Sequence, residues 1–272
     1  MNTKQLIKKL INNIFIFKKV VPVKIPVASC QDSFKGKCAI VSGGSSGIGF
    51  AIADKLSKSG CKVFLLGRNE MKLQEASRKI GCDYVVSDIS DLVQTQKVID
   101  HLFERERVDL LVNSAGINVN EAFGNVTEHG WDICIDTNVK GTYFLTQSVT
   151  NKMKKLKIKG HVLNLSSASA LRPCYSVYVI SKHIIKDITE GMAQALIPYG
   201  IVVNAIAPGP TATPMLQKKD DDDLYFPNNP SLRMASVDEI ADLALYMLSD
   251  FGNYIVGSTF YITGGGGIVD RE

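Results

Sequence analysis

The sequence predicts an α/β fold in which a doubly wound, mainly parallel, seven-stranded sheet carries helices on both faces. Short runs rich in Val, Ile and Leu alternate with longer segments of helical spacing, as expected for repeated βαβ units. A glycine-rich turn joins the first apolar run to the first helical segment. With 272 residues and 45% hydrophobic content, the chain can form one large core.

Seven strands are expected where apolar, β-branched residues form short runs, because the strands of a parallel sheet are buried on both faces. They lie near residues 38–42, 61–66, 83–86, 109–113, 160–165, 201–205 and 258–262. Helices are expected where apolar residues recur at helical spacing. They lie near residues 47–59, 69–79, 91–104, 129–153, 176–198 and 237–248.

The turn after the first strand spans residues 42–49 and reads Ser-Gly-Gly-Ser-Ser-Gly-Ile-Gly. Strand, glycine turn and helix follow in the order that a Rossmann-type sheet uses to bind a dinucleotide. Glycines let the backbone approach a pyrophosphate, and the first N–H groups of the helix point at its charge. A P-loop is excluded, because no Lys-Ser or Lys-Thr pair follows Gly49. A glycine-rich run on its own is also compatible with an ordinary tight turn.

The spacing of Gly43, Gly47 and Gly49 resembles the cofactor turn of the short-chain dehydrogenase/reductase family, in which Thr commonly stands where this chain has Ser42. The resemblance covers residues from about 35 to 267 and is to the compact, single-domain members with a Tyr-x-x-x-Lys motif. Ser114, usually Asn in the family, and Thr263, more often Asp, are small departures. The further motifs, in the family's order, are Asp88, Asn113-Ser114-Ala115-Gly116, Asn138-Val139-Lys140-Gly141, Ser166-Ser167, Tyr178-x-x-x-Lys182, and Asn204 to Gly209 with Thr213.

Tyr178 and Lys182 lie four residues apart on an expected helix, so their side chains share one face. Reduction of a carbonyl builds negative charge on oxygen and requires a proton donor and hydrogen bonds aimed at that oxygen. A nearby ammonium is expected to lower the pKa of Tyr178 from about 10 toward working pH. Such a pair taken alone also arises by chance on many helices.

The resemblance implies four catalytic residues, Asn138, Ser167, Tyr178 and Lys182. Tyr178 would be the acid/base, and Lys182 would also hold the nicotinamide ribose. Ser167 would hydrogen-bond the substrate oxygen, and Asn138 would support a water-linked proton path. Taken singly, Ser167 is also compatible with a strand end, and Asn138 with an ordinary helix residue.

The identity of the catalytic serine stays open in the sequence. Ser167 lies 11 residues before Tyr178, whereas the family usually has about two residues more between them. The missing residues fall in the loop 171–175, where a shorter chain is tolerated more easily than in a strand. Ser166 or Ser169 therefore remain alternatives. Tyr175 cannot replace Tyr178, because no Lys lies four residues after it.

The cofactor is expected to be NADP(H) in preference to NAD(H). Enzymes that prefer NAD usually place an acidic side chain at the end of the second strand, and here that position holds Gly67. The next residue, Arg68, can pair with a 2′-phosphate, although a solvated arginine at a strand end is common. The expected cofactor-binding residues are Ser42, Gly43, Ser46, Gly47, Ile48, Gly49, Arg68, Asp88, Ile89, Asn113, Ala115, Gly116, Tyr178, Lys182, Pro208, Gly209 and Thr213.

The chain divides into a basic amphipathic extension with a linker at residues 1–34 and a single Rossmann-type catalytic domain at residues 35–272. Residues 1–37 hold eight Lys and one Asp, which leaves the remainder with a net charge of −3. An apolar stripe within residues 6–15 predicts an amphipathic helix. Contact of residues 1–19 with a membrane surface is one interpretation, but packing against protein is favoured because a stripe usually means burial.

Charge and cysteine usage exclude several classes of protein. The net charge of +4 is too small to indicate a nucleic-acid binder, which needs a concentrated basic face. The six Cys form no C-x-x-C pair and the four His no cluster, so no metal site is expected and the thiols indicate a reducing cytoplasm.

The sequence therefore predicts a cytoplasmic oxidoreductase that transfers a hydride between NADP(H), or NAD(H), and a small carbonyl or alcohol substrate. The segment 215–233 is expected to close over that substrate, whose identity the residues do not reveal. The resemblance implies a homodimer or homotetramer. The alternative is a catalytically silent dinucleotide-binding sensor or scaffold, because a fold does not fix a function.

Overall fold

A computed structural model describes residues 29–216 and 223–269 of the protein. The amphipathic helix predicted within residues 1–19, and with it the hypothesis of membrane contact, lies outside the described residues. In the part of the chain that is described, no helix is both long and apolar enough to cross a bilayer.

Seven strands form one sheet in the order β3-β2-β1-β4-β5-β6-β7, and every pairing is parallel. The predicted doubly wound sheet is therefore confirmed. Because the chain turns in opposite directions from β1 and β4, the carboxyl edge at these strands is a topological switch point, where open α/β sheets have a ligand-binding crevice. The strands are β1 (Cys38–Ser42), β2 (Lys62–Gly67), β3 (Asp83–Val86), β4 (Leu110–Asn113), β5 (His161–Leu165), β6 (Val202–Pro208) and β7 (Thr259–Ile262).

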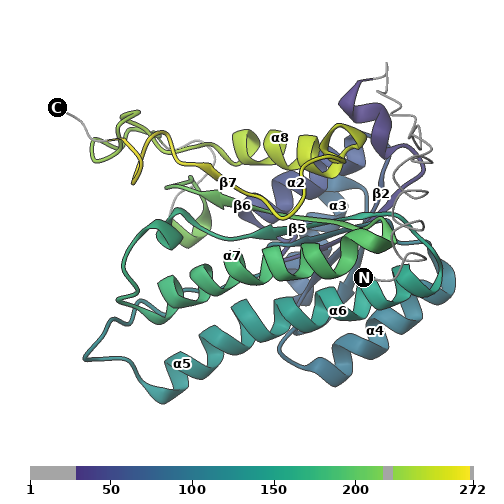
Figure 1. Cartoon of the computed structure of the whole chain (residues 1–272), viewed down its shortest axis with the longest axis horizontal. Coiled ribbons are helices and arrows are strands. Elements are labelled where there is room, and N and C mark those ends of the chain that lie inside the picture. Colours follow the sequence, from purple (N-terminus) through teal and green to yellow (C-terminus); the bar gives the residue numbers. More distant parts are fainter. Residues whose placement is uncertain (1–28, 217–222, 270–272) are drawn as a thin grey trace, which may run out of the picture.

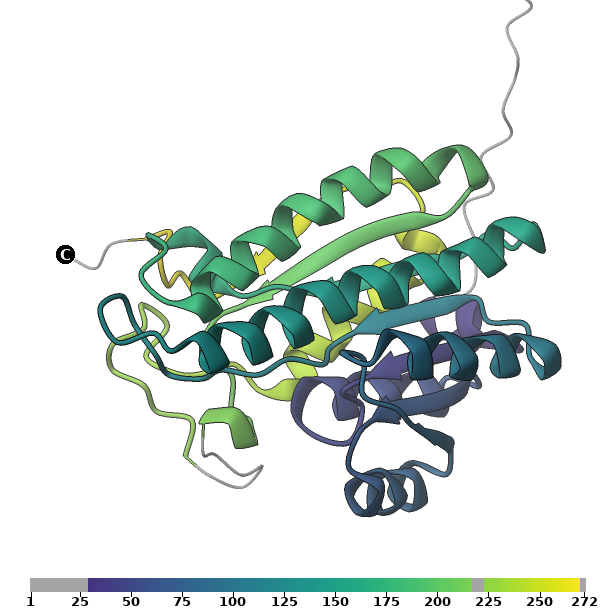
Figure 2. The ribbon, with the colours of Figure 1, turned by 90° about the horizontal axis from the view of Figure 1, so that it is seen from below.

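Helices cover both faces of the sheet (Figures 1 and 2). One face carries α2 (Gly47–Lys58), α3 (Glu70–Ile80) and α8 (Val237–Leu248). The other carries α4 (Leu92–Arg105), α6 (Thr142–Lys155) and α7 (Val177–Leu196). The short helix α5 (Glu128–Ile135) precedes α6. Short turns are η1 (Cys30–Phe34), η3 (Ala168–Leu171), η4 (Ile197–Tyr199), η5 (Pro214–Leu216) and η6 (Asp250–Gly252), all 3-10, and the π-helical η2 (Asp136–Gly141).

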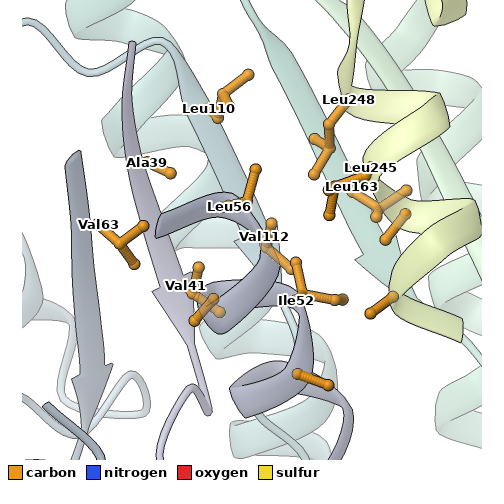
Figure 3. Close-up of a cluster of buried hydrophobic side chains, with 14 of the residues drawn as sticks. Ala39, Val41, Ile52, Leu56, Val63, Leu110, Val112, Leu163, Leu245 and Leu248 are labelled. Atoms are coloured by element: carbon orange, nitrogen blue, oxygen red, sulfur yellow. The ribbon is translucent and has the colours of Figure 1, made fainter. Parts of the chain in front are cut away.

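The core on the first face is a layer of aliphatic side chains between sheet and helices. Figure 3 shows Val41 and Val112 of the central strands beside Ile52 and Leu56 of α2 and Leu245 of α8. Burial of each such side chain contributes about 1.5–3 kcal/mol to stability. This rigid layer fixes α2 above the crevice.

Five helices begin with a side-chain cap, as their sequences favour. In each, an oxygen of the cap residue accepts a hydrogen bond from a backbone N–H of the first turn. The caps are Asn69 for α3, Asp91 for α4, Thr127 for α5, Ser176 for α7 and Ser236 for α8.

The packed body begins earlier than predicted. The turn η1 lies within the expected linker 1–34, yet Phe34 is fully buried in the core. The Cys30 thiol also contacts the carbonyl oxygen of Leu245 at 3.6 Å. Residues 30–34 therefore belong to the body, because an aromatic ring covers the end of the core beside α8.

The predicted helix 129–153 is interrupted. The chain is helical through α5, η2 and α6, but the middle six residues, Asp136–Gly141, form a π-helical turn. Such a turn displaces a backbone group from the regular hydrogen-bond ladder, and π-turns are frequent at functional sites. Asn138 lies in this turn.

His161 begins β5 at the amino edge of the sheet, opposite the crevice, and only 6% of it is exposed. Among the described residues, its Nε2 atom has no hydrogen-bond partner. Burial, and then the positive charge of Lys37, lower the pKa of His161 to about 4. The fold therefore accommodates the neutral imidazole.

We expect the protein to lose stability as the pH falls from about 6.5 toward 4. The unfolded chain binds a proton at His161 near its ordinary pKa of about 6.5, whereas the folded chain does so only near 4. Neutral His161 therefore contributes its full share to the free energy of unfolding above about pH 6.5. As the pH falls below that value, the free energy of unfolding decreases by up to about 1.4 kcal/mol per pH unit. Urea unfolding across this range should show a flatter pH dependence for His161→Phe than for the parent. His101→Gln, at an exposed position of α4, is the control, and equal slopes for parent and His161→Phe would contradict the assignment.

Candidate active site

The glycine turn after β1 approaches the loop after β4 so closely that only glycine fits. Gly43 has a φ of +68°, and a Cβ there would lie 2.7 Å from the backbone of Ala115. A Cβ on Gly49 would lie 2.5 Å from the carbonyl oxygen of Gly43. The buried Ser42 hydroxyl accepts a hydrogen bond from the Ala115 N–H at 3.3 Å and donates to the Val112 carbonyl at 3.4 Å. These contacts hold the two loops at the crevice.

The amino end of α2 differs from those of the five capped helices. Its N-cap residue, Ser46, makes no side-chain cap hydrogen bond, and Gly47 follows with a φ of +55°. The first N–H groups of α2 are therefore left for another acceptor, and the helix dipole favours an anion there. With the close-packed glycines, this end fits the pyrophosphate of a dinucleotide.

Arg68 follows β2 directly, and its side chain is 63% exposed. Its guanidinium is 3.9 Å from the carboxylate of Asp88, which accepts hydrogen bonds from the backbone N–H and the hydroxyl of Ser90. A long ion pair of this kind leaves the guanidinium open to a further anion. A Cβ on Gly67 would be 3.5 Å from the Leu73 side chain, which is ordinary contact.

Asn113 and Ile89 are buried inside the fold. The Asn113 amide donates to Thr146 Oγ1 and to Asn164 Oδ1, each at 2.8 Å, and so ties β4 to α6 and β5. Ile89, 4% exposed, packs against Gly141 in the π-turn. The two side chains therefore hold the loops after β3 and β4 against the body of the fold.

Gly116 lies where the expected cofactor residues meet the expected catalytic ones. A Cβ there would be 3.3 Å from Asn138 Oδ1 and 3.6 Å from the Lys182 ammonium. On the opposite side of the crevice, a Cβ on Gly47 would be 3.4 Å from the Thr213 methyl. Segments far apart in the sequence thus converge on one place.

Tyr178, Ser167 and Lys182 come together. Ser167 follows β5 and lines the same cleft as Tyr178 in the first turn of α7, where its hydroxyl favours the phenolate form of Tyr178. The Lys182 ammonium lies 5.5 Å from the centroid of the Tyr178 ring and donates to the Leu165 carbonyl at 2.9 Å. The arrangement puts a hydroxyl pair beside a buried cation.

Geometry separates the three candidate serines. Ser166 is buried and donates to the Lys182 carbonyl at 2.8 Å. Ser169 donates its backbone N–H to the Ser167 hydroxyl oxygen at 3.1 Å. Ser166 is thus committed to the Lys182 carbonyl, and the side chain that acts on the pKa of Tyr178 is that of Ser167.

The expected lowering of the Tyr178 pKa is wrong for this structure. Burial raises the pKa of Tyr178, and the neighbouring Ser167 hydroxyl opposes that shift. Burial also lowers the pKa of Lys182 to about 8. The reason is physical: both groups are removed from water, so desolvation disfavours the phenolate and the ammonium alike.

Asn138 is held by the loop after β4. Its Oδ1 accepts a hydrogen bond from the Ile117 N–H at 2.8 Å, and its amide donates to the Ile117 carbonyl at 2.9 Å and to the Ser181 hydroxyl at 3.0 Å. Ser181 in turn donates to the Tyr178 carbonyl at 2.7 Å. The π-turn is thereby tied to the first turn of α7.

A cleft of about 740 Å³ opens at this edge of the sheet. Its walls come from the glycine turn, the loops after β4 and β5, the start of α7 and the segment after β6. One continuous space therefore joins cofactor and catalytic positions. The predicted site residues that line it are Ile48, Ser167, Tyr178, Pro208, Gly209 and Thr213.

Several residues of this network were not predicted from sequence. Ser181 had a usable signal, because it lies three residues after Tyr178 on the same helix. Ile117 and Leu165 contribute only backbone atoms, which any side chain would supply. Among the described residues, no group of three or more His, Cys, Asp or Glu is placed to hold a metal ion.

Comparisons with known proteins agree with this geometry. Residues 43–266 match the family model described as enoyl-(acyl carrier protein) reductase. An acetoacetyl-CoA reductase of Acinetobacter sp. is 33% identical over 241 residues, covering 84% of this chain and 97% of that protein. An uncharacterized oxidoreductase of Staphylococcus epidermidis is 37% identical over 196 residues, covering 68% and 83% respectively.

A solved structure is also similar. A gluconate 5-dehydrogenase from Burkholderia cenocepacia, in complex with NADP and tartrate, aligns with a TM-score of 0.79 at 27% identity, covering 87% of this chain and 98% of that one. Fold, site and relatives together define an oxidoreductase built on a Rossmann-type sheet. The chain belongs to the short-chain dehydrogenase/reductase family.

Proposed function

We propose that the protein is an NADP(H)-dependent oxidoreductase that interconverts a carbonyl compound and its alcohol, with Tyr178 as the acid/base. The observation that carries the proposal is the placement of Ser167 and Tyr178 in one cleft that also reaches the glycine turn, with the Lys182 ammonium 5.5 Å from the Tyr178 ring. Binding of a dinucleotide alone does not require this pair of hydroxyls.

Each of the four residues has a separate role in the proposed reaction. A nicotinamide bound at the cleft would supply the hydride for reduction or accept it in oxidation. Ser167 and Tyr178 donate hydrogen bonds to the substrate oxygen, and Tyr178 gives its proton to that oxygen as charge develops. Lys182, at 5.5 Å from the phenol ring, stabilises the phenolate left behind. Asn138 keeps the π-turn and α7 in register through Ser181.

The direction of the pKa shift favours reduction. Because burial raises the pKa of Tyr178, its hydroxyl stays protonated at neutral pH and is a proton donor. Oxidation of an alcohol needs the phenolate, so we expect it to be favoured as the pH rises.

The preference for NADP(H) rests on Gly67 and Arg68 at the end of β2. The absence of a carboxylate at residue 67 removes the repulsion that would disfavour a 2′-phosphate. The exposed Arg68 guanidinium supplies a charge-assisted, bidentate donor. The similar gluconate 5-dehydrogenase is in complex with NADP, which supports the proposal.

We also propose a homo-oligomer in the cytoplasm. The outer surface of α5 and α6 exposes apolar side chains that a second copy would cover, among them Trp131 at 42% and Tyr143 at 42%. All six cysteines are free thiols, as is usual in a reducing compartment. Small carbonyl or alcohol compounds would be the substrates.

A panel of carbonyl substrates, assayed with NADPH and with NADH, tests the proposal. We expect oxidation of NADPH that depends on the carbonyl, with a slower reaction from NADH. Calorimetric titration of both cofactors runs in parallel. Tight binding of NADPH without turnover of any aldehyde, ketone or keto acid in the panel would favour a silent sensor or scaffold instead.

A further inference from the structure

The described residues that line the cleft carry very little formal charge. Among the described residues that line it, Arg172 is the only cation and Glu121 the only carboxylate. The remaining lining is apolar or neutral and polar, including the amides of Asn118 and Asn228. Within the described part of the chain, Arg172 and Glu121 are therefore the two charged side chains that line the space open to a substrate.

Glu121 is already engaged within the protein. Its carboxylate accepts hydrogen bonds from the Thr127 N–H at 2.8 Å and from the Thr127 hydroxyl at 3.1 and 3.2 Å. Thr127 is the N-cap of α5, where the helix dipole favours negative charge. The negative charge of Glu121 is thus compensated locally.

The charge of Arg172, in contrast to that of Glu121, is not compensated by a described residue. Its backbone is fixed on both sides, because its N–H donates to the Ser169 carbonyl at 3.0 Å and its carbonyl lies 2.8 Å from Nε2 of His183. The residue is exposed, and in the described part of the chain its guanidinium has no ion pair or hydrogen bond. By contrast, Arg233 is bound through two nitrogens to Glu239.

Arg172 is also close to the reacting centre along the chain. Only the short turn η3, Ala168–Leu171, separates it from Ser167. The contact with His183 ties it to α7, one residue beyond Lys182. The backbone of Arg172 is thus anchored at the cleft, and no described residue competes with a ligand for its guanidinium.

From these observations we infer that the substrate carries an anionic group, a carboxylate or a phosphate, which Arg172 binds while the reacting carbonyl lies at Ser167 and Tyr178. The guanidinium matches both anions through paired hydrogen bonds. This inference rests on the proposed function, because it names the substrate class of the same site.

The test compares each anionic substrate with a neutral partner of the same skeleton. The panel is 3-, 4- and 5-keto acids with their methyl esters, and hydroxyacetone phosphate with hydroxyacetone, all with NADPH. We expect kcat/KM to favour the anion in at least one pair by about 10- to 100-fold, which corresponds to about 1.4–2.8 kcal/mol. The pair with the largest ratio identifies carboxylate or phosphate and the preferred chain length.

Arg172→Gln should reduce that ratio to near one, mainly through KM of the anion, and leave the neutral partner almost unchanged. The matched control is Arg78→Gln, which removes an equal charge from an exposed position of α3. A parent enzyme that treats anion and neutral partner alike, or an Arg172→Gln variant that slows both equally, would overturn the inference while the oxidoreductase stands.

Calorimetry of the same compounds with the NADPH-loaded protein separates the two proposals. Binding of an anion that Arg172→Gln weakens, without turnover of any compound, would support the anion site and defeat the proposed activity. Equal binding of anion and neutral partner would defeat the anion site whether or not turnover is seen.

Discussion

Tyr178→Phe is expected to lower kcat by a hundredfold or more on every carbonyl compound that the parent reduces, while the affinity for NADPH stays within about twofold. The substitution removes one hydroxyl that acts in the chemical step, and general acids typically contribute at least that much. The ring still fills its place at the start of α7 beside Lys182. Steady-state rates and cofactor titration measure the two effects separately.

The same cleft supplies a matched control for this prediction. Tyr175 also lines it, but is 51% exposed and lies three residues before Tyr178. Tyr175→Phe should therefore retain nearly full kcat. Near-normal turnover by the Tyr178 variant would show that another group donates the proton. A parallel loss of NADPH binding would instead indicate damage to the site.

The second large effect is expected at the end of β2. The parent should bind NADPH at least about tenfold more tightly than NADH. Charge-assisted hydrogen bonds contribute about 1.5–3 kcal/mol, and a tenfold difference in affinity corresponds to about 1.4 kcal/mol. Gly67→Asp combined with Arg68→Gln should invert the preference, since it replaces the phosphate partner by a carboxylate. The structure has room for the new side chain, because a Cβ on Gly67 makes only ordinary contact with Leu73.

Fluorescence titration of both cofactors into parent and double variant measures the inversion. Arg105→Gln, at an exposed position in the last turn of α4, controls for the loss of one positive charge. Equal or tighter binding of NADH by the parent would defeat the assignment of Arg68. The Tyr178 prediction would be untouched, because it concerns the chemical step with either cofactor.

The sequence predicts the structure well where a local pattern has one physical solution. Uninterrupted apolar runs predicted every strand to within about three residues, with β6 running on to Pro208. The glycine turn was predicted because residues such as Gly43 are needed where two backbones meet. Phe34 was assigned to a linker, because a single aromatic residue between polar neighbours carries no periodic signal.

The site could be predicted less fully, because it depends on packing across long separations. Asn138, within the π-turn, hydrogen-bonds to Ile117 and Ser181, which lie on two other segments. Which serine lies nearest to Tyr178 depends on the position of α7, which carries Tyr178. The pKa of Tyr178 depends on how deeply the ring is buried, which the four-residue spacing to Lys182 does not reveal.

The uncapped start of α2 gives the protein a stability that depends on its surroundings. A side-chain cap at a helix N-terminus contributes about 1 kcal/mol, and Ser46 forgoes it. An anion that binds these N–H groups restores the missing partner only in the folded chain. Ligand binding to the native state alone adds about 2.7 kcal/mol at a hundred times its dissociation constant. We therefore expect loss of a dinucleotide bound at this helix end to lower the free energy of unfolding and to make the protein more susceptible to proteolysis.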